Sequence, residues 1–113
     1  IRFLSILDYM PTERAARSLS RAHSNYLAMK FDAARADLKE GKAFLEKAAE
    51  TADENARAEM AKLIRDIESV EAKAGTWSHE TSQEIRNLYL RAKKLTVKAA
   101  STFKAKRNKS GDQ

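Results

Sequence analysis

Apolar residues recur in steps of three and four along the middle of the chain. They are Ala56, Met60, Leu63, Ile67, Val70 and Ala74. This heptad spacing predicts one helix with a single narrow apolar stripe, and most positions between the stripe residues are charged. Such a helix cannot bury its stripe alone. We therefore expect a helix over residues 52–74 that packs against other helices.

The last third of the chain has the same spacing. Its stripe consists of Ile85, Leu88, Ala92, Leu95, Ala99 and Phe103. This pattern predicts a helix over residues 79–106. The remaining residues, 107–113, are basic and polar, and we expect them to form a disordered tail.

The first half of the chain contains two apolar stripes that differ in phase. The first stripe is Ala15, Leu19, Ala22, Tyr26 and Met29, and the second is Phe31, Ala34, Leu38, Leu45 and Ala48. One explanation is a single long helix over residues 12–49 whose buried face rotates. The other is a helical hairpin that breaks at Lys30–Asp32, with Asp32 as the N-cap of its second helix. The pattern leaves both open.

Several residues predict where the helices begin and end. Starts are expected at Thr12, at a Thr51-x-x-Glu54 capping box and at Ser78, with a second box at Thr81-x-x-Glu84. Gly75 is expected to end the middle helix. Gly41 either ends a helix or marks a close helix crossing. We favour a continuous helix there, because the apolar spacing resumes directly after it.

The composition agrees with a helical fold. Of 113 residues, 42% are apolar and 34% charged, with only three Gly and one Pro. We predict an all-α fold, an antiparallel bundle of three or four helices with short connections, in a single domain over residues 12–106.

Residues 1–11 form an apolar lead before this domain. The segment Ile1–Met10 is mostly apolar but contains Arg2 and Asp8. A helix needs about 20 apolar residues to span a bilayer, so we predict no transmembrane segment. We expect the lead to pack on the bundle, and the alternative is the end of a membrane anchor.

Part of the first half resembles two known kinds of helical protein. Ala22, Tyr26, Phe31, Ala34 and Leu38 resemble the small and aromatic positions of a tetratricopeptide helix pair, although the Leu-Gly pair of that family is absent. The segment FDAARADLKEGKAFLEKA resembles YfdX-type bacterial helical proteins. Together these resemblances cover about residues 15–48.

The residues that support catalysis or metal binding are scarce. There is no Cys, and the two His residues, His23 and His79, are far apart. The segment after His79 has Gln83 where a His-Glu-x-x-His zinc helix needs its second His. No Gly-x-Ser-x-Gly elbow or phosphate-binding glycine loop is present. We therefore predict no enzyme activity, cofactor or metal.

Positive charge is concentrated in the last third of the chain. The net charge is +6, and residues 76–113 contain nine basic and three acidic side chains, whereas residues 51–75 contain four and six. Phosphate-binding surfaces depend on such charge. The candidates for an anionic partner are Arg86, Arg91, Lys94, Lys98, Lys104, Lys106 and Arg107.

Trp77 is the only tryptophan and lies between two predicted helices. We expect it to pack over the helix ends, and the alternative is an exposed aromatic anchor. These features predict a non-catalytic helical binding or scaffold module that engages a protein partner or associates with itself. The alternative is an electrostatic binder of nucleic acid or an anionic surface through the basic C-terminal helix.

Overall fold

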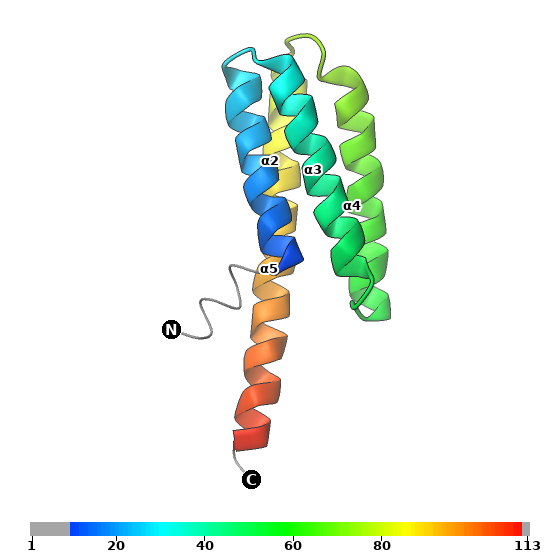
Figure 1. Ribbon diagram of the computed structural model, residues 1–113, viewed down its shortest axis with the longest axis vertical. Helices are drawn as coiled ribbons and strands as arrows, with labels where there is room; N and C mark the ends of the chain where they lie inside the picture. The colour runs from blue at the N-terminus through cyan, green and yellow to red at the C-terminus, as the bar shows by residue number, and fades with distance from the viewer. Residues whose placement is uncertain (1–9, 112–113) are drawn as a thin grey trace.

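The chain forms a bundle of antiparallel helices (Figure 1). A computed structural model describes the backbone of residues 10–111 and the side chains of residues 10–98. These residues contain four helices and no strand: α2 (Pro11–Leu27), α3 (Phe31–Ala49), α4 (Glu54–Lys73) and α5 (His79–Gly111). The prediction of an all-α bundle with short connections is confirmed.

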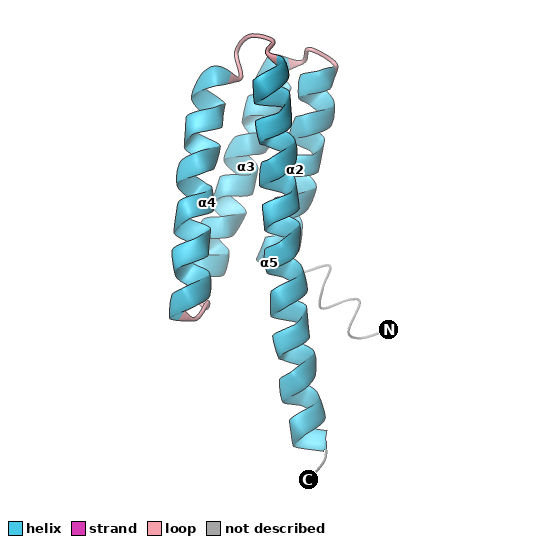
Figure 2. Cartoon of the chain, turned by 180° about the vertical axis from the view of Figure 1, so that it is seen from behind, coloured by secondary structure: helices cyan, strands magenta, loops and turns pink. Residues whose placement is uncertain are grey.

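The four helices form a closed ring of neighbours. Helix α2 packs against α3 and α5, and α4 packs against the same two helices from the other side. Successive helices run in opposite directions, as Figure 2 shows from behind. The connections α2–α3 and α4–α5 therefore lie together at one end of the bundle. Helix α5 is longer than the others and extends beyond the opposite end.

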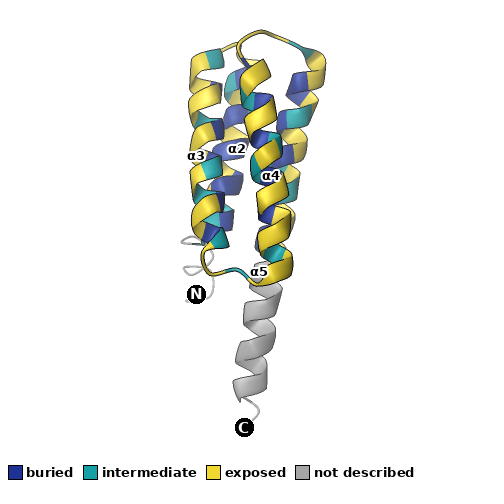
Figure 3. Ribbon diagram, turned by 90° about the vertical axis from the view of Figure 1, so that its right-hand side faces the viewer, coloured by how far each residue is buried: buried dark blue, intermediate teal, exposed yellow. Residues whose placement is uncertain are grey.

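Among the residues with described side chains, the predicted stripes lie in or against the core (Figure 3), except Met29, which the hairpin turn places on the surface. On α4 the buried residues are Met60, Leu63, Ile67 and Val70, and Ala74 directly follows them. On α5 they include Ile85, Leu88, Ala92 and Leu95. Each helix buries one face against two neighbours, so narrow stripes suffice to build the core.

The first half of the chain is a hairpin. Helix α2 ends at Leu27, and the amides of Met29 and Lys30 donate hydrogen bonds to the carbonyls of Tyr26 (2.9 Å) and Asn25 (2.8 Å). This is the Schellman pattern that reverses the chain after a helix. The second of the two alternatives, the break, is confirmed. The predicted cap is wrong, because Lys30 is the N-cap of α3 and Asp32 lies in its first turn.

The Schellman pattern requires left-handed backbone at Met29. Its φ is +61°, and it is the only non-glycine residue with positive φ in the described chain. An L-residue in this conformation costs about 1–2 kcal/mol, so Gly is usual at this position. Met29 is nevertheless 60% exposed and buries little to offset that cost.

Other caps differ from those predicted. Helix α2 begins with Met10 as N-cap and Pro11 in the first turn, where its missing N–H costs nothing, whereas Thr12 is buried inside the helix. The N-cap of α4 is Asp53 instead of Thr51, and its carboxylate accepts a hydrogen bond from the Ala56 amide (2.8 Å). An Asp closer to the first helical residue therefore replaces the expected capping box.

The prediction for the start of α5 is confirmed at Ser78. Its carbonyl accepts from the Ser82 amide (3.1 Å) and its hydroxyl accepts from the Thr81 amide (3.4 Å). The second box, beginning at Thr81, is wrong, since Thr81 is buried inside the first turn of α5.

The ends of the described helices differ from the ends of the predicted domain. Helix α5 continues to Gly111, five residues beyond the predicted end at residue 106. The lead at residues 1–9 lies outside the described residues, as do the side chains of Ala99 and Phe103. Among the described helices, none combines the length and hydropathy needed to span a bilayer.

Gly41 marks a close contact between α3 and α2. It is buried inside α3, and a Cβ placed on it would lie 3.1 Å from two side-chain carbons of Leu19 and 3.5 Å from the Ala15 carbonyl oxygen. Leu19 is fully buried, so neighbouring side chains limit how far it can shift. The preference for a continuous helix is confirmed, and Gly41 allows α2 and α3 to approach closely.

We expect Gly41→Val to destabilise the protein by about 1–3 kcal/mol, because overpacking at Leu19 outweighs the improved helix propensity. Urea unfolding followed by circular dichroism measures this. The matched control is Ala43→Val, an exposed position on the same helix, which we expect to cost less than about 0.7 kcal/mol. Equal effects at the two positions would contradict the close contact.

Candidate functional site

The seam between α4 and α5 is joined by three ion pairs. They are Lys73–Glu84 (2.9 Å), Arg91–Asp66 (2.6 Å) and Lys98–Glu59 (3.4 Å). From one pair to the next, the position moves seven residues back along α4 and seven residues forward along α5. Because seven residues are two helical turns, the pairs lie at equal intervals along the seam.

A groove lies in the same seam. Its volume is about 260 Å³, and it is lined by Glu59, Lys62, Leu63, Arg91, Lys94, Leu95 and Lys98. Leu63 and Leu95 are buried and form an apolar floor, whereas the cationic residues lie at the rim. The groove therefore combines apolar and positively charged surface.

The structure brings together only some of the predicted basic residues. Arg91, Lys94 and Lys98 share the groove, but Arg91 and Lys98 are already paired with carboxylates of α4. Arg86 is exposed on another part of α5, close enough to His23 to affect its protonation. The side chains of Lys104, Lys106 and Arg107 lie outside the described residues.

Lys62 is the one cation of the groove that is absent from the candidates predicted from the sequence. It belongs to the segment of net negative charge, so a charge count over residues 51–75 conceals it. The useful signal is its position, because Lys62 lies between Glu59 and Asp66, the α4 members of two ion pairs.

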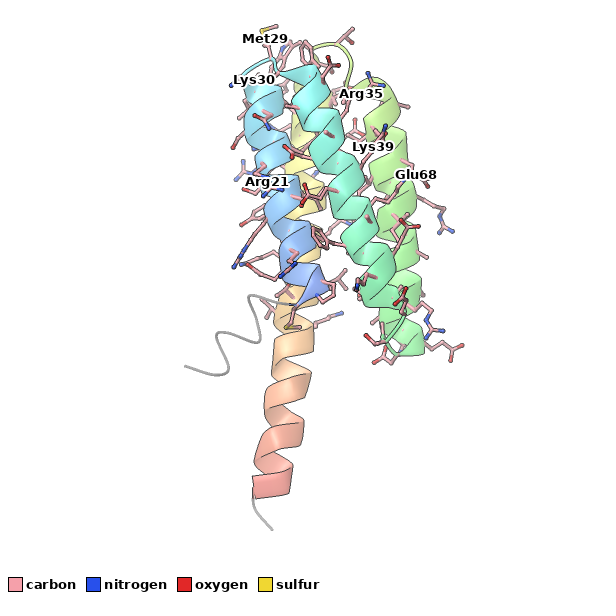
Figure 4. The ribbon with its side chains drawn as sticks, in the orientation of Figure 1. Arg21, Met29, Lys30, Arg35, Lys39 and Glu68 are labelled. Atoms are coloured by element: carbon pink, nitrogen blue, oxygen red, sulfur yellow. The ribbon has the colours of Figure 1, made fainter. Side chains whose placement is uncertain are left out.

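A second surface lies at the end of the bundle that holds the α2–α3 and α4–α5 connections. The structure describes five exposed large apolar side chains, and three of them belong to these connections or their edges: Leu27 (51% exposed), Met29 (60%) and Trp77 (45%). We call these three residues the apolar end. Figure 4 shows Met29 at the outermost part of the bundle.

Tyr26 holds the apolar end in shape. Its ring is fully buried and stacks on Trp77, with centroids 5.1 Å apart and planes 22° apart. Its hydroxyl donates to the Thr76 carbonyl (2.6 Å) and accepts from the Ser78 amide (2.7 Å). Trp77 therefore both packs over a helix end through one ring face and remains partly exposed.

His23 is the one described group with a clearly shifted pKa. Partial burial, and to a lesser extent the positive charge of Arg86, lower the pKa of His23 below its usual value of 6.5. Within the described residues no three His, Cys, Asp or Glu side chains come together in a way that could hold a metal ion. His23 is thus a titrating group at the α2–α5 contact and has no metal-binding partners there.

The comparisons with known proteins supply no relative. No family model, curated protein or solved structure matches the chain. The resemblances to tetratricopeptide pairs and to YfdX-type proteins are therefore untested and stay predictions.

We expect Tyr26→Phe to destabilise the protein by about 1–3 kcal/mol, since it leaves the Thr76 carbonyl and the Ser78 amide without their partner. Urea unfolding measures the loss, and the emission of Trp77 should shift to the red as the α4–α5 connection loosens. Tyr89→Phe is the control. Tyr89 is half-buried, and its hydroxyl has no hydrogen bond to any described residue. A loss for Tyr26→Phe no larger than for Tyr89→Phe would contradict the bracing role.

The lowered pKa of His23 predicts a pH dependence. Below about pH 6.5 the unfolded chain binds the His23 proton more readily than the folded chain. Stability is therefore greatest above that pH and falls as the pH drops through the pKa of the folded state. Urea unfolding between pH 7.5 and about pH 5 should show a smaller decline for His23→Gln than for the wild type. His79→Gln, at an exposed position, is the control and should behave as the wild type.

Proposed function

We propose that this chain is a non-catalytic binding module that engages another protein through the apolar end, formed by Leu27, Met29 and Trp77. The observation that carries the proposal is that these three exposed apolar side chains belong to two connections that lie at the same end of the bundle. Exposed apolar patches of monomeric proteins commonly mark interaction sites. Trp and Met are also enriched at the centres of protein interfaces.

The rigidity of this surface supports the proposal. The Tyr26 hydroxyl ties the α4–α5 connection to α2, and its ring supports one face of Trp77. A side chain already held in place loses less entropy on binding. Trp77 is still 45% exposed and therefore available as an anchor.

The backbone of Met29 supports it further. Gly would adopt the same left-handed conformation with little strain, and the Met side chain is mostly exposed. The stability of the bundle therefore gains nothing from Met at this position. Strained residues of this kind concentrate at functional surfaces.

The charges around the apolar end favour a protein over an anionic surface. The exposed neighbours in the two connections and first turns are of both signs, with Lys30 and Asp32 beside Met29, and Glu80 three residues after Trp77. A mixed polar rim around an apolar centre is the usual pattern of a protein interface.

The electrostatic alternative has less support from the described residues. Three α5 cations, Arg91, Lys93 and Lys98, form ion pairs with carboxylates of α4 or α2. A polyanion would have to compete with these carboxylates. Binding to nucleic acid that weakens with salt and is unaffected by changes at the apolar end would favour this alternative.

The proposal is tested with two variants of the apolar end, Met29→Gly and Trp77→Ala. The wild-type chain is used to isolate a protein partner from extract of the source organism, and the affinity of the purified pair is then measured by fluorescence. We expect each variant to weaken the complex at least about tenfold. Met29→Gly should at the same time raise the free energy of unfolding by about 0.5–1 kcal/mol, because it removes left-handed strain. If Met29→Gly binds the partner more weakly although it is more stable than the wild type, the loss of binding cannot result from a loss of folding.

Leu90→Ala provides the matched control. Leu90 is also a large apolar residue, 44% exposed, but it lies on α5 away from the two connections. We expect it to leave the complex unchanged. A similar loss for Leu90→Ala and Trp77→Ala would contradict the assignment of the apolar end. Light scattering on the wild-type chain and Trp77→Ala would reveal whether the partner is a second copy.

A further inference from the structure

The ion pairs between α4 and α5 divide the seam into two equivalent intervals. One interval lies between Lys73–Glu84 and Arg91–Asp66, and the other between Arg91–Asp66 and Lys98–Glu59. Both are seven residues long on each helix, which is about 10 Å of helix. Corresponding positions in the two intervals can therefore be compared directly.

The two intervals differ in charge. In the first interval, one exposed position on each helix is neutral, Ser69 on α4 and Asn87 on α5. In the second, seven residues away on each helix, the same positions are Lys62 and Lys94. Like charges at neighbouring positions repel, so this arrangement weakens the seam.

Neither lysine is neutralised by a carboxylate among the described residues. The nearest acidic groups of the seam, Glu59 and Asp66, form ion pairs with Lys98 and Arg91. Lys62 and Lys94 form no ion pair with any described side chain. The second interval is also where the groove of about 260 Å³ lies.

The charge of the groove defines the ligand that it fits. Four cations, Lys62, Arg91, Lys94 and Lys98, and two carboxylates, Glu59 and Asp66, give a local charge of +2. A phosphate monoester carries about −1.5 to −2 at neutral pH. The buried side chains of Leu63 and Leu95 add an apolar floor beneath the lysines.

We propose that this groove binds a small phosphate monoester. Lys62 and Lys94 contact the phosphate from opposite helices, and the organic group of the ligand lies over Leu63 and Leu95. Bound phosphate removes the repulsion between the two lysines and joins α4 to α5. The site lies away from the apolar end and does not depend on the protein-binding function proposed above.

The ion pairs that bound the groove favour a small ligand over nucleic acid. A polyanion needs a row of unpaired cations along its path. In the described seam the cations before and after the second interval are neutralised by carboxylates, which leaves one interval for one anionic group. The groove volume is also slightly below the usual range for drug-sized ligands, which begins at about 300 Å³.

The test uses inorganic phosphate and phenyl phosphate as probes, at constant ionic strength with chloride as the reference anion. Calorimetric titration measures affinity, and thermal unfolding measures stabilisation. We expect saturable binding of both probes, tighter for phenyl phosphate because of the apolar floor. We also expect a higher Tm in phosphate than in chloride. Absence of saturable binding would overturn the proposal.

The decisive variant is the double substitution Lys62→Ser and Lys94→Asn, which copies the neutral pair of the first interval. We expect it to weaken phosphate binding at least about tenfold. Without phosphate and at low salt, it should raise the Tm, since it removes the repulsion. Loss of binding together with gain of stability cannot result from misfolding.

The control is Lys47→Ser with Arg65→Asn, which removes two positive charges from exposed positions outside the groove. We expect its phosphate affinity to match that of the wild type. Equal weakening in the control would mean that phosphate responds only to net charge, and would overturn the site. If double-stranded DNA competes with phosphate for the groove, the proposal of a small ligand is overturned and the ligand is a polyanion.

Discussion

The buried hydroxyl of Tyr26 joins the two halves of the bundle. It accepts a hydrogen bond from Ser78 and donates one to Thr76, so the C-terminal end of α2 is fixed to the connection between α4 and α5. The same ring contacts Phe31 at the start of α3, with centroids 5.5 Å apart, and stacks on Trp77. One residue thereby sets the geometry of both connections at this end, and the apolar end depends on it.

The charged residues of this protein serve two purposes. Many of those described pair across helix contacts, as Arg21 does with Glu40 (2.9 Å) between α2 and α3, and Lys39 does with Glu71 (3.7 Å) between α3 and α4. Figure 4 shows Arg21 and Lys39 on the outer faces of their helices. Exposed pairs contribute little to stability individually, but they fix which helices are neighbours and in what register. Lys62 and Lys94 depart from this arrangement, because two lysines without a carboxylate partner line the same groove from opposite helices.

Met29 illustrates a second departure from what folding alone favours. The hairpin needs a left-handed residue after α2, and the chain has Met where Gly would serve with less strain. The two departures lie at different places on the bundle. Each replaces the locally most stable choice with a side chain that is exposed and chemically suited to binding.

The sequence by itself determined the helices and their buried faces. Heptad steps such as Met60, Leu63, Ile67 and Val70 indicate the buried face, because that stripe faces the neighbouring helices and most residues off it are exposed. The break after Leu27 stayed open, since the phase change at Met29 fits either a rotated face or a hairpin. Only the backbone of Met29 and its hydrogen bonds resolve that choice.

The tertiary structure alone decided which residues form surfaces. Arg91 and Lys98 read as free positive charge in the sequence, yet α4 neutralises both. Lys62 read as part of an acidic segment, yet it faces the same groove as Lys94. Periodicity along one helix fixes which side of that helix is buried. The register between two helices is set by packing and ion pairs that act across the contact, and no local pattern in either helix specifies it.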